Sequence, residues 1–190
     1  MARYGKDHKQ ATKRRIVEAA GRRLKRDGID GSGIAPLMAD AGLTVGGFYA
    51  HFESKEDLVA SVVAEQLREQ GEKFSAQPVE QIVRDYLSVQ HRDNFEGGCP
   101  SAALLDEIGR SADSTKRAYT NGVLAVIDDI AARLMPDDPQ SARVKTLSVF
   151  ALMVGTLQVS RALADRQLAD EVLAQGIHNA LALLGVRHQS

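Results

Sequence analysis

The fold is decided by residues 41–55, whose sequence is AGLTVGGFYAHFESK. Gly42 is suited to end one short helix, and Thr44 can cap the next. Ser32 can cap the helix that precedes Gly42, which completes a helix, a tight turn and a second helix. Residues 54–57, SKED, have the form of a capping box and open a long helix. This stretch therefore predicts a helix-turn-helix unit that continues into a long helix.

Two adjacent glycines lie inside the second helix of this unit. Gly46 and Gly47 each cost a helix about 1 kcal/mol relative to alanine, and a purely structural helix would not need them. Missing side chains permit another backbone to approach closely. Around the glycines lie four side chains that suit phosphate oxygens, namely Thr44, Tyr49, His51 and Lys55. The pattern predicts contact with a nucleic-acid backbone.

Helical periodicity extends over nearly the whole chain. Apolar residues recur at helical spacing from about His8 to Asp27, with Arg and Lys on the other faces. Further helices are expected over residues 32–40, 44–51, 54–74, 78–91, 114–135, 139–164 and 167–185, and another begins at Pro100. Alternating runs of strand length are missing. The sequence predicts an all-helical protein of about nine helices.

Charge is distributed unevenly along the 190 residues, although the formal net charge is only −1. Residues 1–55 contain eleven Lys and Arg against six Asp and Glu, whereas the remainder contains 13 against 19. A basic N-terminal part followed by an acidic remainder predicts that the N-terminal part binds a polyanion. Solvated helix faces are the alternative explanation of the charge taken alone.

Neither a membrane-spanning helix nor a secretion signal is expected from the sequence. The longest uncharged stretch, residues 146–160, is shorter than the roughly 20 apolar residues that span a bilayer. The basic N-terminus leads into no apolar run. Cys99 is the single cysteine, which excludes an internal disulfide and a multi-cysteine metal site. A cytoplasmic protein without a metal or a cofactor is expected.

Residues 29–58 resemble the DNA-binding segment of the TetR family of transcriptional regulators, and the match extends from Lys13 to about Val62. Its most specific parts are AGLT at 41–44 and GGFYAHF at 46–52, followed by Ser54 and Lys55. The resemblance implies a three-helix DNA-binding domain over residues 1–53 and an effector-binding and dimerisation domain over 54–190. It also implies a homodimeric repressor that binds a palindromic double-stranded operator and is released by a small molecule.

The resemblance assigns roles within the DNA-binding segment. Thr44, Val45 and Tyr49 would face the major groove, where Val45 offers only apolar contact. Phosphates would be held by Ser32 and Lys55, with His51 joining them and with Gly46 and Gly47 allowing close approach. Phe48 and Phe52 would pack into the core. Val45 and Gly47 stand where many relatives have longer polar residues, which weakens direct reading of the bases. DNA recognition would then depend more on phosphate contacts, on DNA shape and on a flexible basic arm before Ile16.

The resemblance also implies a ligand cavity between long helices of the second domain. The candidates for lining it are mainly apolar: Phe74, Tyr86, Phe95, Leu104, Ile108, Tyr119, Val123, Phe150, Met153 and Leu157. Hydrogen bonds would come from Tyr86, His91 and Tyr119. A largely apolar or aromatic effector is therefore expected.

The last two expected helices carry more apolar surface than one core can cover. The final helix has two stripes, one of Leu168, Val172, Gly176, Ala180 and Leu183 and one of Leu173, Ile177, Leu181 and Leu184. The helix before it offers Val144, Leu147, Ala151 and Val154, with Phe150 and Leu157 beside them. One face would close the core and the other would form a two-fold homodimer. A fully buried helix in a monomer is the alternative.

Cys99 offers another way to sense a signal. It directly precedes Pro100, the expected start of a helix whose dipole favours a thiolate, and Gly97 and Gly98 leave the approach open. A repressor that senses electrophiles or oxidants through Cys99 is thus an alternative to ligand sensing. A small inert thiol is the simpler interpretation.

Two further classes of function are open to a helical chain with a basic N-terminal part. A helical enzyme acting on a small molecule, with Cys99 as nucleophile, would need a catalytic set, yet the sequence has neither an H-E-x-x-H motif, nor a phosphate loop, nor a G-x-S-x-G motif. A helical interaction protein could use its basic head on RNA or anionic lipid. Residues 42–55 favour a DNA-binding regulator over both, so no enzymatic activity is expected.

Overall fold

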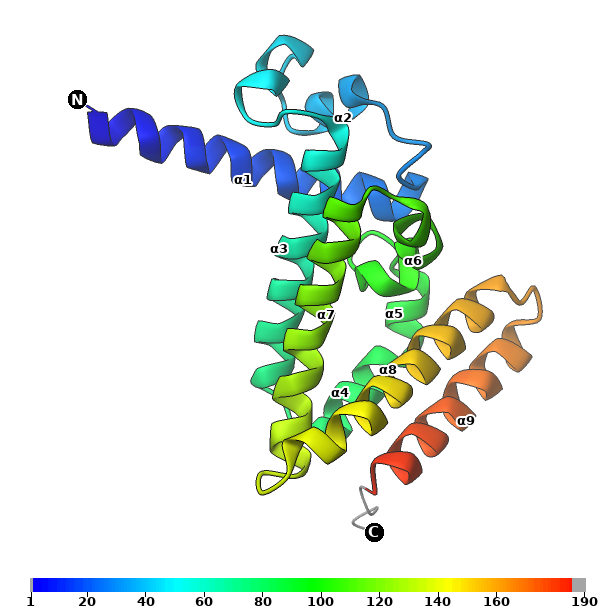
Figure 1. The fold of residues 1–190 in the computed structure, drawn as a ribbon. Helices are drawn as coiled ribbons and strands as arrows, with labels where there is room; N and C mark the ends of the chain where they lie inside the picture. Colours follow the sequence, from blue (N-terminus) through cyan, green and yellow to red (C-terminus); the bar gives the residue numbers. More distant parts are fainter. Residues whose placement is uncertain (1, 186–190) are drawn as a thin grey trace.

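The computed structural model describes residues 2–185, with the side chains of residues 7–185. Every regular element in this part of the chain is helical, which confirms the all-helical prediction. The elements are α1 (Ala2–Asp27), α2 (Ile34–Asp40), the 3₁₀ helix η1 (Val45–Ala50), α3 (Lys55–Ser75), α4 (Val79–Tyr86), α5 (Val89–Asp93), α6 (Pro100–Arg110), α7 (Asp113–Leu134), α8 (Pro139–Ala162) and α9 (Arg166–Leu184) (Figure 1).

The first three helices form a small head at one end of the molecule (Figure 1). Gly42 adopts a positive φ of 67°, which lets the chain turn from α2 into η1. Phe48 is fully buried and Phe52 almost so, with ring centroids 5.7 Å apart. They pack among apolar residues of α1, α2 and α3, as predicted. The head is therefore a helix-turn-helix unit held by its own aromatic core.

Helix α3 joins the head to the rest of the molecule, here called the body (α4–α9). Ser54 caps α3 by accepting a hydrogen bond from the Asp57 N–H at 3.2 Å, and the Asp57 carboxylate accepts from the Glu53 N–H at 3.1 Å. The predicted cap at Ser54 is confirmed, while the reciprocal hydrogen bond comes from Glu53, one residue before the cap, and not from Ser54. Farther along, α3 runs beside α7, where a Cβ on Gly122 would lie 2.7 Å from the Cβ of Leu67. The apolar core of the head continues along α3 to Leu67, so a boundary at residues 53/54 stays a prediction.

The short helix expected over residues 44–51 is present, as the 3₁₀ helix η1 with Thr44 at its cap position. Three local expectations were wrong. The helix expected over residues 78–91 is two helices, because the Ser88 hydroxyl accepts from the His91 N–H at 3.1 Å and caps a new one. Gly33 rather than Ser32 precedes α2 as its cap. The basic arm before Ile16 is not a separate flexible segment, because α1 extends without a break from Ala2.

Helices α8 and α9 lie side by side at the far end of the body (Figure 1). The stripe of Leu173, Leu181 and Leu184 faces the core. Gly176 and Ala180 of the other stripe are also buried, and a Cβ on Gly176 would lie 2.5 Å from Thr156 Cγ2. By length and composition alone α8 could cross a membrane, which is weak evidence because core helices of soluble proteins meet the same test.

Candidate nucleic-acid interface and interface cavity

The exposed surface of η1 is the outermost part of the head. Tyr49 is 69 % exposed, and Thr44, Val45 and Gly46 are exposed beside it. Thr44 occupies the cap position of η1 without using its hydroxyl there. A Cβ on Gly46 would meet no atom within 4 Å, and one on Gly47 would meet only Met38 Cε at 3.8 Å. Packing inside the chain therefore does not require either glycine, and the surface is open to a partner.

A group of cations from α1 lies beside the end of η1. Burial lowers the pKa of His51, and the nearby charges of Lys9, Lys13 and His8 lower it further. The ammonium of Lys13 lies 4.8 Å from the centroid of the Phe52 ring. Sequence reasoning did not single out Lys9 and Lys13 individually. Their spacing of four residues on one expected helix was the available signal.

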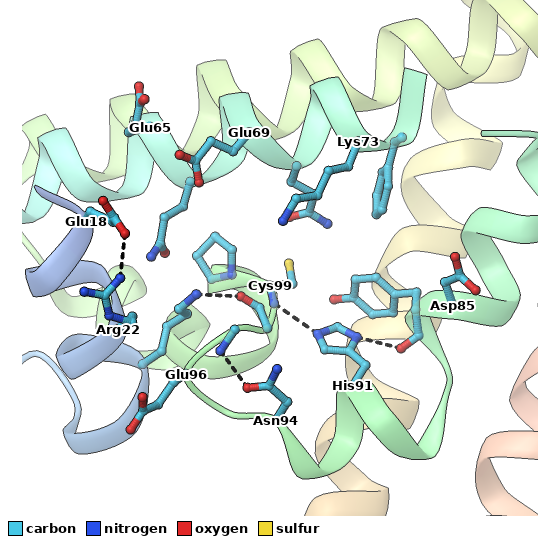
Figure 2. A pocket seen from close by; sticks show the side chains of 18 of the residues that line it. Glu18, Arg22, Glu65, Glu69, Lys73, Asp85, His91, Asn94, Glu96 and Cys99 are labelled. Carbon is cyan, nitrogen blue, oxygen red and sulfur yellow. Dashed lines mark hydrogen bonds and ion pairs between the residues drawn. The ribbon is translucent and has the colours of Figure 1, made fainter. Parts of the chain in front are cut away.

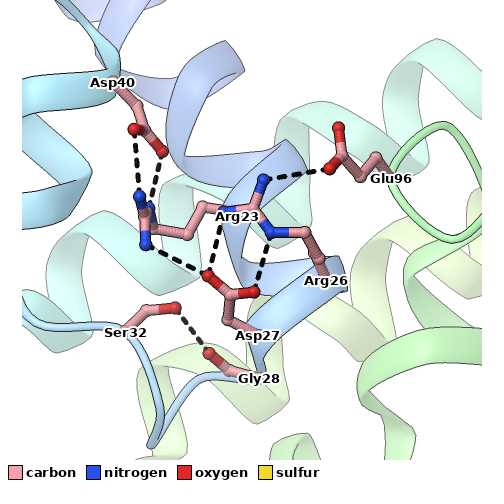
Figure 3. Close-up of polar contacts among 7 residues, drawn as sticks. All are labelled: Arg23, Arg26, Asp27, Gly28, Ser32, Asp40 and Glu96. Atoms are coloured by element: carbon pink, nitrogen blue, oxygen red, sulfur yellow. Dashed lines mark hydrogen bonds and ion pairs between the residues drawn. The ribbon is translucent and has the colours of Figure 1, made fainter.

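Two predicted phosphate ligands are held within the protein. Ser32 is fully buried, and its hydroxyl donates to the Gly28 carbonyl at 2.8 Å, where it closes the turn after α1 (Figure 3). A phosphate contact by Ser32 is therefore contradicted in this conformation. The Lys55 ammonium donates to the Ile29 carbonyl at 2.6 Å. Since an ammonium carries three donors, Lys55 keeps capacity for a further acceptor.

The C-terminal end of α1 ties the head to the body. Lys25 donates to the Gly98 carbonyl at 2.9 Å. Arg26 pairs with Glu96 at 3.0 Å (Figure 3). The Asp30 N–H donates to Glu107 at 3.0 Å. These contacts reach the loop before α6 and α6 itself. A shift of this segment would thus act directly on α1 and, through it, on the head.

A second clamp holds α2 against α1. Arg23 pairs with Asp40 at 2.6 Å and with Asp27 at 3.0 Å (Figure 3). Hydrogen bonding and charge from Arg23 lower the pKa of the Asp40 carboxyl. Helix α2, which packs against η1, is therefore joined to α1 by an ion pair.

A cavity of about 770 Å³, here called the interface cavity, lies between α1, α3 and residues 85–100 (Figure 2). Its walls are mostly polar or charged. Charged side chains from α1 and α3 line it, including Arg22, Lys25, Glu69 and Lys73. Among the ten predicted pocket residues, Phe74 and Tyr86 line this cavity. The expectation of a largely apolar pocket is therefore wrong for it, because α1 supplies one wall.

The other predicted pocket residues lie elsewhere. Phe150 and Met153 line a second, apolar cavity of only about 20 Å³, to which Phe74 also contributes. Phe95 is exposed, with the Arg161 guanidinium 4.5 Å from its ring centroid. Tyr119 donates to the Ser101 hydroxyl at 3.1 Å. The remaining four, Leu104, Ile108, Val123 and Leu157, belong to the packed core.

Cys99 lines the interface cavity but is only 6 % exposed, so the expectation of an openly accessible thiol is wrong. Its N–H donates to His91 Nε2 at 3.0 Å, and His91 Nδ1 bonds the Tyr86 carbonyl at 2.7 Å (Figure 2). A carbonyl only accepts, so Nδ1 carries the proton and Nε2 is the acceptor. Both nitrogens are thus used by a neutral imidazole, which fixes the loop before α6.

We expect this neutral imidazole to make the loop sensitive to acid. Burial lowers the pKa of His91, and the charges of Arg161 and Lys25 lower it further, against the opposing effect of the Tyr86 carbonyl. The free energy of unfolding should hold its full contribution from His91 above pH of about 6.5, and lose it as the pH falls through the lower folded-state pKa. Urea unfolding at a series of pH values from 7.5 to 5.0 measures this loss.

His91→Gln should be less stable at pH 7.5 and should depend less on pH. His178→Gln, at an exposed position of α9, is the matched control and should keep the wild-type profile. Equal pH dependence of the His91→Gln variant and the wild type would contradict the assignment.

The comparisons with known proteins agree with this geometry. Residues 16–62 match the family model described as bacterial regulatory proteins, tetR family. None of the curated proteins searched matches the sequence significantly. The structure resembles NemR of E. coli in its reduced form, with 15 % identity and a TM-score of 0.73 over 90 % of this chain and 95 % of that one.

Two other solved structures are similar over their whole length. A TetR-family regulator from Agrobacterium tumefaciens has 19 % identity and a TM-score of 0.70, over 90 % of this chain and 98 % of that one. FadR of Bacillus subtilis, solved with stearoyl-CoA, has 16 % identity and a TM-score of 0.63, over 92 % and 98 %. The described part of the chain thus has the fold of these solved structures. Its residues 16–62 match the tetR-family model, which confirms the resemblance found in the sequence.

Proposed function

We propose that the protein is a ligand-responsive transcriptional repressor that binds a palindromic operator as a homodimer and is released by a small-molecule effector. Residues 1–53 act as the DNA-binding domain, and residues 54–190 act as the effector-binding and dimerisation domain. The observation that carries the proposal is the open, glycine-containing face of η1 within a segment that matches the tetR family. Its place of action is the cytoplasm, and no enzymatic activity is proposed.

The proposed DNA contacts use both the backbone and the side chains of the head. Gly46 and Gly47 leave room for a phosphate to approach the backbone of η1. Tyr49 reaches the groove edge, and Val45 offers a methyl surface to a thymine methyl. Lys9 and Lys13 add cations along the same side of the head. Most of the affinity then comes from phosphates and DNA shape, with few contacts to base edges.

The proposed dimer joins the outer faces of α8 and α9 from two chains. Val144 is 72 % exposed and Leu183 is 52 % exposed, and Leu147 and Leu168 of the same two helices are exposed as well. A Cβ on Gly155 would meet nothing within 4 Å, so this part of α8 is open as well. Apolar side chains gathered on one face of a helix pair favour burial against a partner. A two-fold dimer buries the same face of both chains and matches the symmetry of a palindrome.

Release by an effector follows from linkage. Two heads engage two half-sites only at a spacing set by the DNA, so a ligand that prefers another arrangement of head and body lowers DNA affinity. The contacts of Lys25, Arg26 and Asp30 with residues 96–107 are the connection through which such a ligand would act. Sensing through Cys99 remains the less favoured alternative because the thiol is buried.

The proposal is tested by selecting bound sequences from a pool of random duplexes with the full-length protein at physiological salt. A palindrome is expected, with half-site centres about 34–36 Å apart or a multiple of that distance. Affinity for the selected duplex should fall steeply as salt concentration rises. Failure to enrich any sequence, together with equal affinity for selected and random duplexes, would overturn the proposal.

A further inference from the structure

We propose that the interface cavity is the effector site and that it takes a small aromatic organic anion. The anionic group lies between Lys25 and Lys73, the ring packs beside Phe74 and Tyr86, and Gln70 hydrogen-bonds the ligand. The regulatory consequence rests on the proposed function, whereas the binding itself does not. This site differs from the apolar pocket that the sequence predicted, because one of its walls is α1 of the head.

Two cations from different helices face the cavity without a carboxylate partner. Lys25 comes from α1 and Lys73 from α3, and Figure 2 shows Lys73 reaching from α3 toward the segment that carries His91 and Cys99. Among the described side chains, neither lysine forms an ion pair, and Lys25 donates to the neutral Gly98 carbonyl. Burial lowers the pKa of Lys25 to about 8, and the charge of Lys73 also lowers it, against the opposing effects of Cys99 and Glu69. A bound anion would relieve both effects.

Most of the acidic side chains around the cavity are already engaged. Glu18 pairs with Arg22 at 2.7 Å, Glu65 with Arg68 at 2.7 Å, and Glu96 with Arg26 at 3.0 Å. Asp85 accepts hydrogen bonds from the amides of Gln77 and Gln81. These two amides are neutral, so Asp85 keeps its negative charge, as does Glu69, the other unpaired acid of the lining. Three lining cations form no ion pair among the described side chains, namely Arg14, Lys25 and Lys73. The uncompensated charge of the cavity is therefore one positive charge.

Buried polar groups in the lining have no hydrogen-bond partner. Gln70 is only 8 % exposed, and neither atom of its amide forms a hydrogen bond. The Oε1 atom of Gln66 is in the same situation. The Tyr86 hydroxyl is buried too; the Cys99 thiol lies near it, but no hydrogen bond of normal geometry joins them. Because native proteins rarely leave such groups unpaired, their convergence on one cavity indicates a site built for a polar ligand.

The shape and the remaining walls define the other part of the ligand. A volume of about 770 Å³ lies within the range of small-molecule sites. The rings of Phe74 and Tyr86 line the end of the cavity near α4. They provide an apolar and aromatic surface for a ring, while the lysines bind the charged group. An aromatic carboxylate or sulfonate combines these features.

Occupation of the cavity would change a contact between head and body. An anion held between Lys25 and Lys73 would draw the Lys25 ammonium toward itself and weaken the hydrogen bond from that ammonium to the Gly98 carbonyl. The loop before α6 would then be tied less firmly to α1. Because α1 also carries Lys9 and Lys13 beside η1, the ligand would change the position of the head relative to the DNA.

The binding test uses a matched pair of probes, 1-hydroxy-2-naphthoate and its neutral amide, 1-hydroxy-2-naphthamide. Calorimetric titration of the full-length protein should give a Kd for the acid at least ten-fold below that for the amide. Lys25→Met and Lys73→Met should each weaken acid binding ten-fold or more and change amide binding little. Lys116→Met, at an exposed position of α7, is the matched control and should bind both probes as the wild type does.

Gln70→Leu separates a ligand-binding role from a structural one. Since it removes two unpaired buried atoms, it should raise the melting temperature of the free protein while weakening binding of both probes. Absence of saturable acid binding, equal affinity for acid and amide, or acid binding unchanged by both lysine substitutions would overturn the site.

Anisotropy with the selected duplex tests regulation separately. The acid should weaken DNA binding at least ten-fold and the amide should not. If the acid binds but DNA affinity stays the same, the regulatory role fails. If the acid binds and no duplex is ever bound, the proposed function fails while the anion site stands.

Discussion

Gly47→Leu is expected to abolish binding to the selected duplex while the protein remains fully folded. The free chain accommodates a side chain there, since a Cβ would meet only Met38 Cε at 3.8 Å, and leucine favours a helical backbone more than glycine does. On DNA, the same side chain would occupy the space through which a phosphate approaches η1. The loss of affinity should be at least about 100-fold, equivalent to about 2.7 kcal/mol. Fluorescence anisotropy measures binding, and urea unfolding measures stability.

Gly109→Leu provides the matched control for this substitution. Gly109 lies in α6, away from η1, and a Cβ there would also meet nothing within 4 Å. This variant should bind the duplex as the wild type does. If Gly47→Leu also retained wild-type affinity, the interpretation of the paired glycines would be wrong.

The double substitution Leu147→Glu and Leu183→Glu is expected to convert the dimer into a folded monomer. Both leucines are exposed in the single chain, so the monomer tolerates a carboxylate at each position. In the dimer each carboxylate would be buried without a partner, and four such charges per dimer should cost more than about 4 kcal/mol, or roughly 1,000-fold in Kd. Sedimentation velocity at micromolar concentration measures the change. DNA affinity should fall with it, because a monomer engages one half-site.

Leu105→Glu tests whether any added surface charge has the same effect. Leu105 is an exposed leucine of α6, outside the α8 and α9 face. This control should remain a dimer. A double variant that sediments as a dimer, or a wild-type protein that sediments as a monomer, would refute the proposed interface.

The head was predictable from the sequence because its determinants are local. Gly42, the capping box at Ser54 and the pair of Phe48 and Phe52 act over a few residues, and the structure places them as expected. Ser32 was misjudged for a related reason. Its hydroxyl can cap a helix or close a turn, and the sequence does not distinguish these uses.

The interface cavity was not predictable because it depends on contacts between distant segments. Helical periodicity identifies the apolar face of α1, but it does not reveal that Lys25 on the polar side meets the Gly98 carbonyl. Leu104 and Leu157 were predicted to line a ligand pocket because they are apolar, but they are buried in the core. The orphaned amide of Gln70 is evident only once α1, α3 and residues 85–100 are packed together.

In the proposed function, one dimer binds two half-sites of one operator with its two heads. The most direct test is equilibrium binding to the selected palindrome and to the same duplex with five base pairs inserted between its half-sites. The insertion turns the half-sites onto opposite faces of the DNA, because one helical turn takes 10–10.5 base pairs. We predict tight binding of two chains to the selected duplex and loss of most of that affinity after the insertion. Equal affinity for the two duplexes would contradict the account.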